Sequence, residues 1–122
     1  MLKRHFKNER GFTLVESLVT LSIIGVLVTI ALSQFSSHKI RALDVSARAD
    51  LQSLWLTCKL YWHDKGALSN CSQSVVAVAS YGYRTSPGVI VSGSGTQAVF
   101  SASASHEESP NSLSIDAQGL VL

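Results

Sequence analysis

The sequence is poor in charge, since Asp, Glu, Lys and Arg make up 15% of its 122 residues, against about 25% in an ordinary soluble domain. Together with a hydrophobic content of 46%, this excludes a disordered tail and a coiled coil rich in Glu and Lys. A net charge of +2 is far from the basic stripe of a nucleic-acid-binding module, so direct reading of nucleic acid is not expected. The length allows one domain at most.

The sequence also lacks the residue patterns of an enzyme or a metal site. The histidines show no metal-ligand spacing, and no serine lies in a nucleophile-elbow motif. Glu107 and Glu108 are interpreted as a solvated loop end, and the aromatic residues around Trp55 as packing residues. We therefore predict no enzymatic activity, no metal, no cofactor and no small-molecule substrate.

The bases are concentrated ahead of a long apolar segment. Residues 1–11 carry four bases and one acid, a net charge of +3, whereas residues 12–122 carry six bases and seven acids, a net charge of −1. Residues 12–33 hold a single charge, Glu16. A helix of that length is about 33 Å long, which is enough to cross the roughly 30 Å of bilayer hydrocarbon. The preceding bases predict that the N-terminus stays in the cytoplasm.

Three kinds of export segment compete for residues 12–33. A cleaved secretory signal is supported by the small residues of Ala31-Leu32-Ser33, and it predicts a mature chain that begins at Gln34. Against it, the segment is longer than the usual apolar core of about 7–15 residues. A plain signal anchor would keep an ionised Glu16 in the membrane, at a cost of about 2.5–3.5 kcal/mol. The third is an export helix that is processed and retained.

The residues around the acid favour the third kind. Arg10-Gly11-Phe12-Thr13-Leu14-Val15-Glu16 resembles the cleavage and methylation motif of type IV prepilins and of type II secretion pseudopilins. The resemblance implies a membrane aspartyl peptidase that cuts between Gly11 and Phe12 and methylates the new amino group of Phe12. It makes residues 1–11 a cytoplasmic leader that is removed.

The resemblance also suggests how the helices assemble. The Phe12 amine of one chain would lie beside the Glu16 carboxylate of another and set the register; the alternative is that Glu16 faces lipid headgroups. Small residues on one i+4 row predict a face for helix packing, unless they are incidental. This ridge comprises Thr13, Ser17, Gly25, Thr29 and Ser33. Many members of the family have proline where this chain has Ser33, which leaves open whether the helix melts between Gly25 and Ser33.

The fold class predicted is α+β, a type IV pilin fold. Residues 12–35 are the transmembrane and filament-core helix, and residues 36–65 continue it as an amphipathic helix with an Asp44–Arg48 pair. Residues 66–80 form a connecting loop, in which Val75–Ala79 is strand or short helix. Residues 81–122 form the antiparallel sheet of a globular head, with turns at Ser92–Gly95 and Asp116–Gly119. Its candidate strands are 81–84, 89–92, 97–104, 112–116 and 120–122.

The two cysteines, Cys58 and Cys71, predict one disulfide in an exported chain. The alternative is a buried helix cysteine and a free thiol. A bridge would join the end of the long helix to the loop that follows it.

The resemblance implies the function of a structural subunit of a type IV pilus-like filament. The expected partners are copies of the chain or sister pilins, the prepilin peptidase and the assembly machinery of the inner membrane. The precursor would span the inner membrane once, with its head facing the periplasm, and would become extracellular in the pilus. A minor pilin or secretion pseudopilin is the first alternative, and a secreted binding module is the second.

Overall fold

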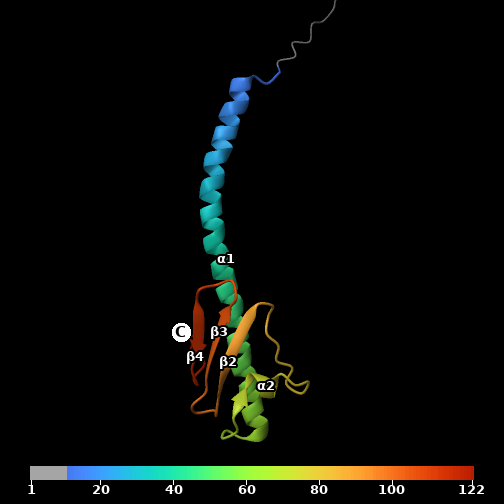
Figure 1. Cartoon of the computed structure of the whole chain (residues 1–122). Coiled ribbons are helices and arrows are strands. Elements are labelled where there is room, and N and C mark those ends of the chain that lie inside the picture. The colour runs from blue at the N-terminus through green and yellow to red at the C-terminus, as the bar shows by residue number, and fades with distance from the viewer. Residues whose placement is uncertain (1–10) are drawn as a thin grey trace, which may run out of the picture. The chain divides into compact units, whose positions relative to one another are not determined.

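The computed structural model describes residues 11–122, so most of the predicted leader, including His5, lies outside the described residues. The elements are α1 (Leu14–Lys65), β1 (Cys71–Ser72), α2 (Gln73–Val76), β2 (Val89–Gly95), β3 (Ser101–His106) and β4 (Ser112–Ile115) (Figure 1). The described chain divides into two compact units, residues 11–36 and 37–122, and α1 contributes to both. A long apolar helix with a four-stranded antiparallel sheet confirms the α+β prediction.

Helix α1 ends at a glycine. No Gly or Pro interrupts the sequence between Val26 and Lys65, and Gly66 follows with a φ of 101°, in the left-handed region that stops a helix. The Gly66 N–H donates to the Trp62 carbonyl over 2.8 Å. Upstream, the backbone stays helical through both Gly25 and Ser33. The missing proline therefore leaves α1 continuous at the place where melting was an open question.

The unit of residues 11–36 has no core. All of its residues are exposed, including Leu, Ile and Val side chains on every side of α1. By length and composition, α1 contains a stretch that can cross a membrane. Such a surface is stable only when lipid or other apolar helices cover it.

The unit of residues 37–122 has a well-defined core between α1 and the sheet. Apolar residues of α1 recur at intervals of three and four, and these are buried: Ala47, Leu51, Leu54, Cys58 and Trp62. The Trp62 ring meets the Phe100 ring edge to face, with centroids 5.4 Å apart. In β3, Ala102 and Ala104 are buried and the alternating serines are more exposed, as expected for a strand with one face on the core.

The sheet has the order β1-β2-β3-β4, with every neighbouring pair antiparallel. Ser92–Gly95, predicted as a turn, instead continues β2, so that prediction was wrong. Gly93 pairs with Ala102, and a Cβ on this glycine would clash with the backbone of Ala102. Glycine here permits close approach of two strands, which the sequence pattern did not distinguish from a turn.

Three further strand predictions differ from the structure, two in whole and one in where the strand begins. Tyr81–Arg84 is not a strand, because Tyr83 folds back onto α1 and its hydroxyl donates to the Asp50 carbonyl over 3.1 Å. The strand predicted from Gln97 begins only at Ser101. At the C-terminal end, Val121 forms an isolated bridge with Ile115 rather than a strand. The segment 75–79 starts within the short helix α2.

Cys58 and Cys71 form a disulfide, with their Cα atoms 5.8 Å apart. It joins the buried face of α1 to β1. A bridge closing a loop of this size stabilises the folded chain by about 3 kcal/mol in the chain-entropy view. The bridge therefore belongs to the head unit and contributes nothing to residues 11–36.

Candidate processing and assembly site

The Gly11–Phe12 bond lies before the first residue of α1, in a segment without regular structure. Gly11 is exposed, with open space where a Cβ would stand, and the Phe12 side chain is 87% exposed. A peptidase needs an extended, accessible substrate, and a bond inside a helix would not offer one. The geometry at this bond is compatible with cleavage.

Thr13 and Glu16 cap the N-terminal end of α1 by reciprocal hydrogen bonds. The Thr13 N–H donates to Glu16 Oε2 over 2.9 Å, and the Glu16 N–H donates to Thr13 Oγ1 over 3.2 Å. This is a capping box, in which each side chain satisfies a backbone donor that the helix leaves unpaired. The motif therefore places Glu16 so that its carboxylate also defines where the helix begins.

The ridge of small residues is exposed, and part of its hydrogen-bonding capacity is used within α1. Thr29 Oγ1 donates to the Val26 carbonyl over 2.7 Å. Beside the ridge, Thr20 Oγ1 donates to the Glu16 carbonyl over 2.8 Å. Ser17, Gly25 and Ser33 remain exposed on the helix surface. Use of the ridge by a neighbouring helix stays a prediction, as does the register role of Glu16.

In the head, the predicted Asp44–Arg48 pair does not form. The Asp44 carboxylate instead accepts hydrogen bonds from Ser109 Oγ over 2.5 Å and from Asn111 Nδ2 over 2.7 Å. These two hydrogen bonds hold the pKa of Asp44 below its ordinary value, and the bond from Ser109 has the larger effect. The loop after β3 thus competes successfully for a carboxylate that helix spacing alone assigns to Arg48.

Asp50 is a structural residue that the sequence analysis missed. It is buried on the apolar face of α1, where it accepts hydrogen bonds from Ser86 N–H over 2.6 Å and from Ser86 Oγ over 3.0 Å. The pKa of the neighbouring Tyr83 hydroxyl is raised to about 12. Burial is the larger cause, and the charge of Asp50 is the smaller one. The signal was available: an acid inside an apolar stripe requires buried partners.

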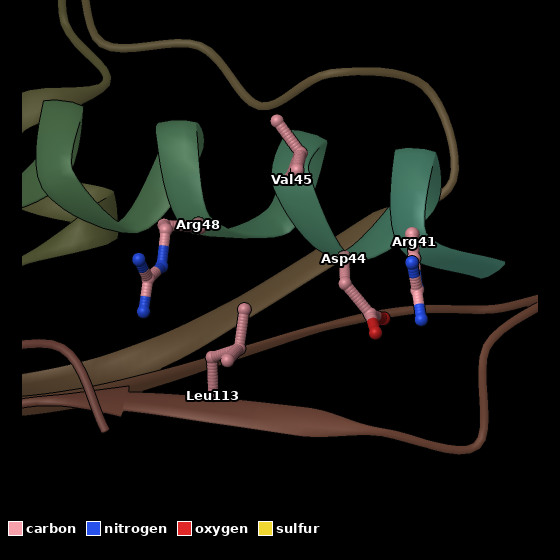
Figure 2. A pocket seen from close by; sticks show the side chains of 5 residues that line it. All are labelled: Arg41, Asp44, Val45, Arg48 and Leu113. Carbon is pink, nitrogen blue, oxygen red and sulfur yellow. The ribbon is translucent and has the colours of Figure 1, made fainter. Parts of the chain in front are cut away.

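A shallow cavity of about 360 Å³ lies between α1 and β4. It is lined by Arg41, Asp44, Val45, Arg48 and Leu113, and Figure 2 shows the two arginines extending from α1 on either side of Leu113. Among residues 11–122 there is no group of three or more His, Cys, Asp or Glu side chains arranged to hold a metal ion.

Two comparisons agree with the motif and the fold. Residues 6–32 match the family described as the prokaryotic N-terminal methylation motif. Over 89 residues, which are 70% of this chain, the sequence is 29% identical to the type IV major pilin protein PilA of Myxococcus xanthus strain DK1622. The chain spans 40% of the length of that relative.

A methylation motif at the start of an uncovered apolar helix, followed by a helix-on-sheet head, is the arrangement expected of a pilin-like chain. Together with the two comparisons, this makes the chain similar to type IV pilins.

Proposed function

We propose that the chain is a structural subunit of a type IV pilus-like filament. The prepilin peptidase cleaves the Gly11–Phe12 bond and methylates Phe12, and the subunit then polymerises through residues 12–35 with copies of itself or with sister pilins. Before assembly it spans the inner membrane once, with the leader in the cytoplasm and the head in the periplasm.

The main support for this proposal is the difference in burial between the two units. Residues 11–36 bury nothing, while residues 37–122 form a core closed by a disulfide. A secreted binding module needs only the second unit, so a long apolar helix without cover supports a role in lipid and then in a helical assembly. The likeness to a protein named a major pilin supports the same role.

Mass spectrometry of the mature chain tests the processing step. We expect an N-methylated Phe12 at the N-terminus. A Gly11→Val variant places a branched side chain beside the scissile bond and should remain uncleaved, whereas Gly25→Ala, also in open space, should be cleaved normally. A mature chain that begins at Gln34 would favour a secretory signal, and one that begins at Met1 would favour a plain anchor; either would contradict the proposal.

Assembly is tested at Glu16. A Glu16→Gln variant keeps a side chain that can accept from the Thr13 N–H but removes the charge. We expect normal cleavage with a loss of filaments, because an unpaired Phe12 amine then lies in an apolar core. Normal filament yield from this variant would contradict the register role and favour contact of Glu16 with headgroups.

A minor pilin or secretion pseudopilin is the second candidate, favoured by Ser33 at the family's proline position. Such a subunit would be rare in the filament and would occupy a tip or a short piston. Quantitative mass spectrometry of sheared filaments separates the two, since a main subunit dominates the filament mass and a minor pilin contributes a small fraction of it.

A further inference from the structure

Most carboxylates in the head unit have a hydrogen-bond or ion-pair partner, but one does not. Among the described residues from Ser37 onward, nearly every carboxylate has a partner within the unit: Asp44, Asp50, Asp64 and Asp116 accept hydrogen bonds, and Glu108 pairs with Lys39 over 2.8 Å. Within this part of the chain, Glu107 is the exposed acid whose carboxylate has no hydrogen bond and no ion pair.

The complementary positive groups lie together in the cavity between α1 and β4. Arg41 and Arg48 are two turns apart on α1, and neither guanidinium has a carboxylate within 4.0 Å among the described residues. Asp44 lies between them in the view of Figure 2. Its oxygens accept hydrogen bonds from Ser109 and Asn111. Asp44 keeps its negative charge, so two guanidinium groups against one carboxylate leave the lining of the cavity with a net positive charge.

The apolar part of the cavity limits what fits there. Leu113, which is half-buried, rises from β4 between the two arginines (Figure 2). Val45 also lines the cavity, and its exposed side chain points away from Leu113. An aliphatic stem ending in a carboxylate satisfies both features, because the stem covers Leu113 while the carboxylate meets a guanidinium in a bidentate pair. A glutamate side chain has this form.

We propose that the cavity lined by Arg41, Arg48 and Leu113 receives Glu107 of a second copy of this chain. The contact joins two different patches of the same molecule, and such a heterologous contact generates an open filament when its rotation does not close. This inference rests on the proposed function and names a head-to-head contact beyond the helix packing that drives assembly.

Charge reversal in the full-length chain tests the contact. In cells with an intact assembly machinery, Arg48→Glu and Glu107→Arg should each lower filament yield by about fivefold, the effect of roughly 1 kcal/mol for an ion pair near the surface. The double variant should restore the yield. Arg84→Glu makes the same charge change at an exposed residue outside the cavity and should have no effect. Unchanged yield in both single variants, or no recovery in the double variant, would overturn the proposal.

Cross-linking separates contact between chains from contact within a chain. Cells that make Arg48→Cys and Glu107→Cys chains together should give a mixed dimer with a short bismaleimide, since the native cysteines are already paired. Replacing the first partner by Arg84→Cys should abolish the dimer. A chain with both new cysteines that links only internally would overturn the proposal.

The failure of this contact is distinguishable from the failure of the proposed function. If the chain is not a filament subunit, the unchanged chain gives no filaments and no N-methylated Phe12. If only the head contact is wrong, the mature N-terminus and the filaments are normal, and the charge variants assemble as well as the unchanged chain.

Discussion

Residues 11–36 and residues 37–122 both carry many large apolar side chains, but only the second unit buries them. Phe35, in the first unit, is 68% exposed, whereas Phe100, in the second, is 1% exposed. Hydrophobic content alone therefore does not indicate that a segment forms a core. The arrangement of polar residues is the better indicator, because the second unit has alternating serines and buried hydrogen-bond acceptors that the first unit lacks.

The comparison assigns different stabilising forces to the two units. In the head, apolar burial, buried hydrogen bonds and the Cys58–Cys71 disulfide act within one chain. In residues 11–36, the backbone hydrogen bonds of α1 are internal, but the apolar free energy is realised only in lipid or among other helices. Stability measured on isolated chains should thus report the head alone.

The largest expected effect compares two phenylalanines. Phe100→Ala should lower the free energy of unfolding by about 3–5 kcal/mol, because it leaves a cavity against Trp62. Phe35→Ala should change it by less than about 0.5 kcal/mol. Both are measured on the detergent-solubilised full chain by denaturant unfolding, followed by the fluorescence of Trp55 and Trp62. Equal effects of the two substitutions would contradict the division into a unit with a core and a unit without one.

A smaller effect is expected at the buried acid. Asp50→Ala removes the acceptor of the Ser86 N–H and should cost about 1–3 kcal/mol of the free energy of unfolding. Glu107→Ala, which removes an exposed carboxylate without a partner, is the matched control and should be neutral in the solubilised monomer. A neutral Asp50→Ala would show that the loop around Ser86 is held by Tyr83 alone.

Acid should weaken the head in a defined direction. Ser109 and Asn111 lower the pKa of Asp44, and Lys39 lowers the pKa of Glu108. The unfolded chain therefore binds protons at a higher pH than the folded chain, near pH 4. The stabilisation is present above about pH 4, and it is lost as the pH falls below that point toward the lowered pKa values of the folded chain. Unfolding of the Asp44→Asn, Glu108→Gln chain should depend less on pH over this range; an unchanged slope would contradict these assignments.

The helix was predictable because its determinants are local. The spacing from Ala47 to Trp62 and the glycine at position 66 are both visible within a few residues. The sheet was less predictable, because its determinants are distant in the sequence. The conformation at Gly93 depends on the close approach of Ala102, and the position of Tyr83 depends on its hydrogen bond to Asp50. Turn and strand signals that depend on a distant neighbour cannot be assigned from local pattern.

The same distinction applies to the site. The motif from Gly11 to Glu16 is contiguous, so its residues were found, and the structure adds that Thr13 and Glu16 bond to each other. Asp44 was identified with the wrong partner, since the competing donors come from Ser109 and Asn111, far along the chain. Asp50 was missed although its place in the apolar stripe is visible in the sequence; only its partner, Ser86, 36 positions away, could not be assigned from local pattern.

The smallest effect is expected at the start of α1, and it is local. Thr13→Ala removes the hydroxyl that accepts from the Glu16 N–H and should cost about 1 kcal/mol at the first turn. Amide hydrogen exchange of the Glu16 N–H in micelles should then be about fivefold faster, while the free energy of unfolding of the head stays unchanged. Thr13→Ser keeps the hydroxyl and should exchange like the unchanged chain. Because residues 11–36 share no core with the head, a loss of head stability on Thr13→Ala would show that the two units are coupled through α1, against the division drawn from their burial.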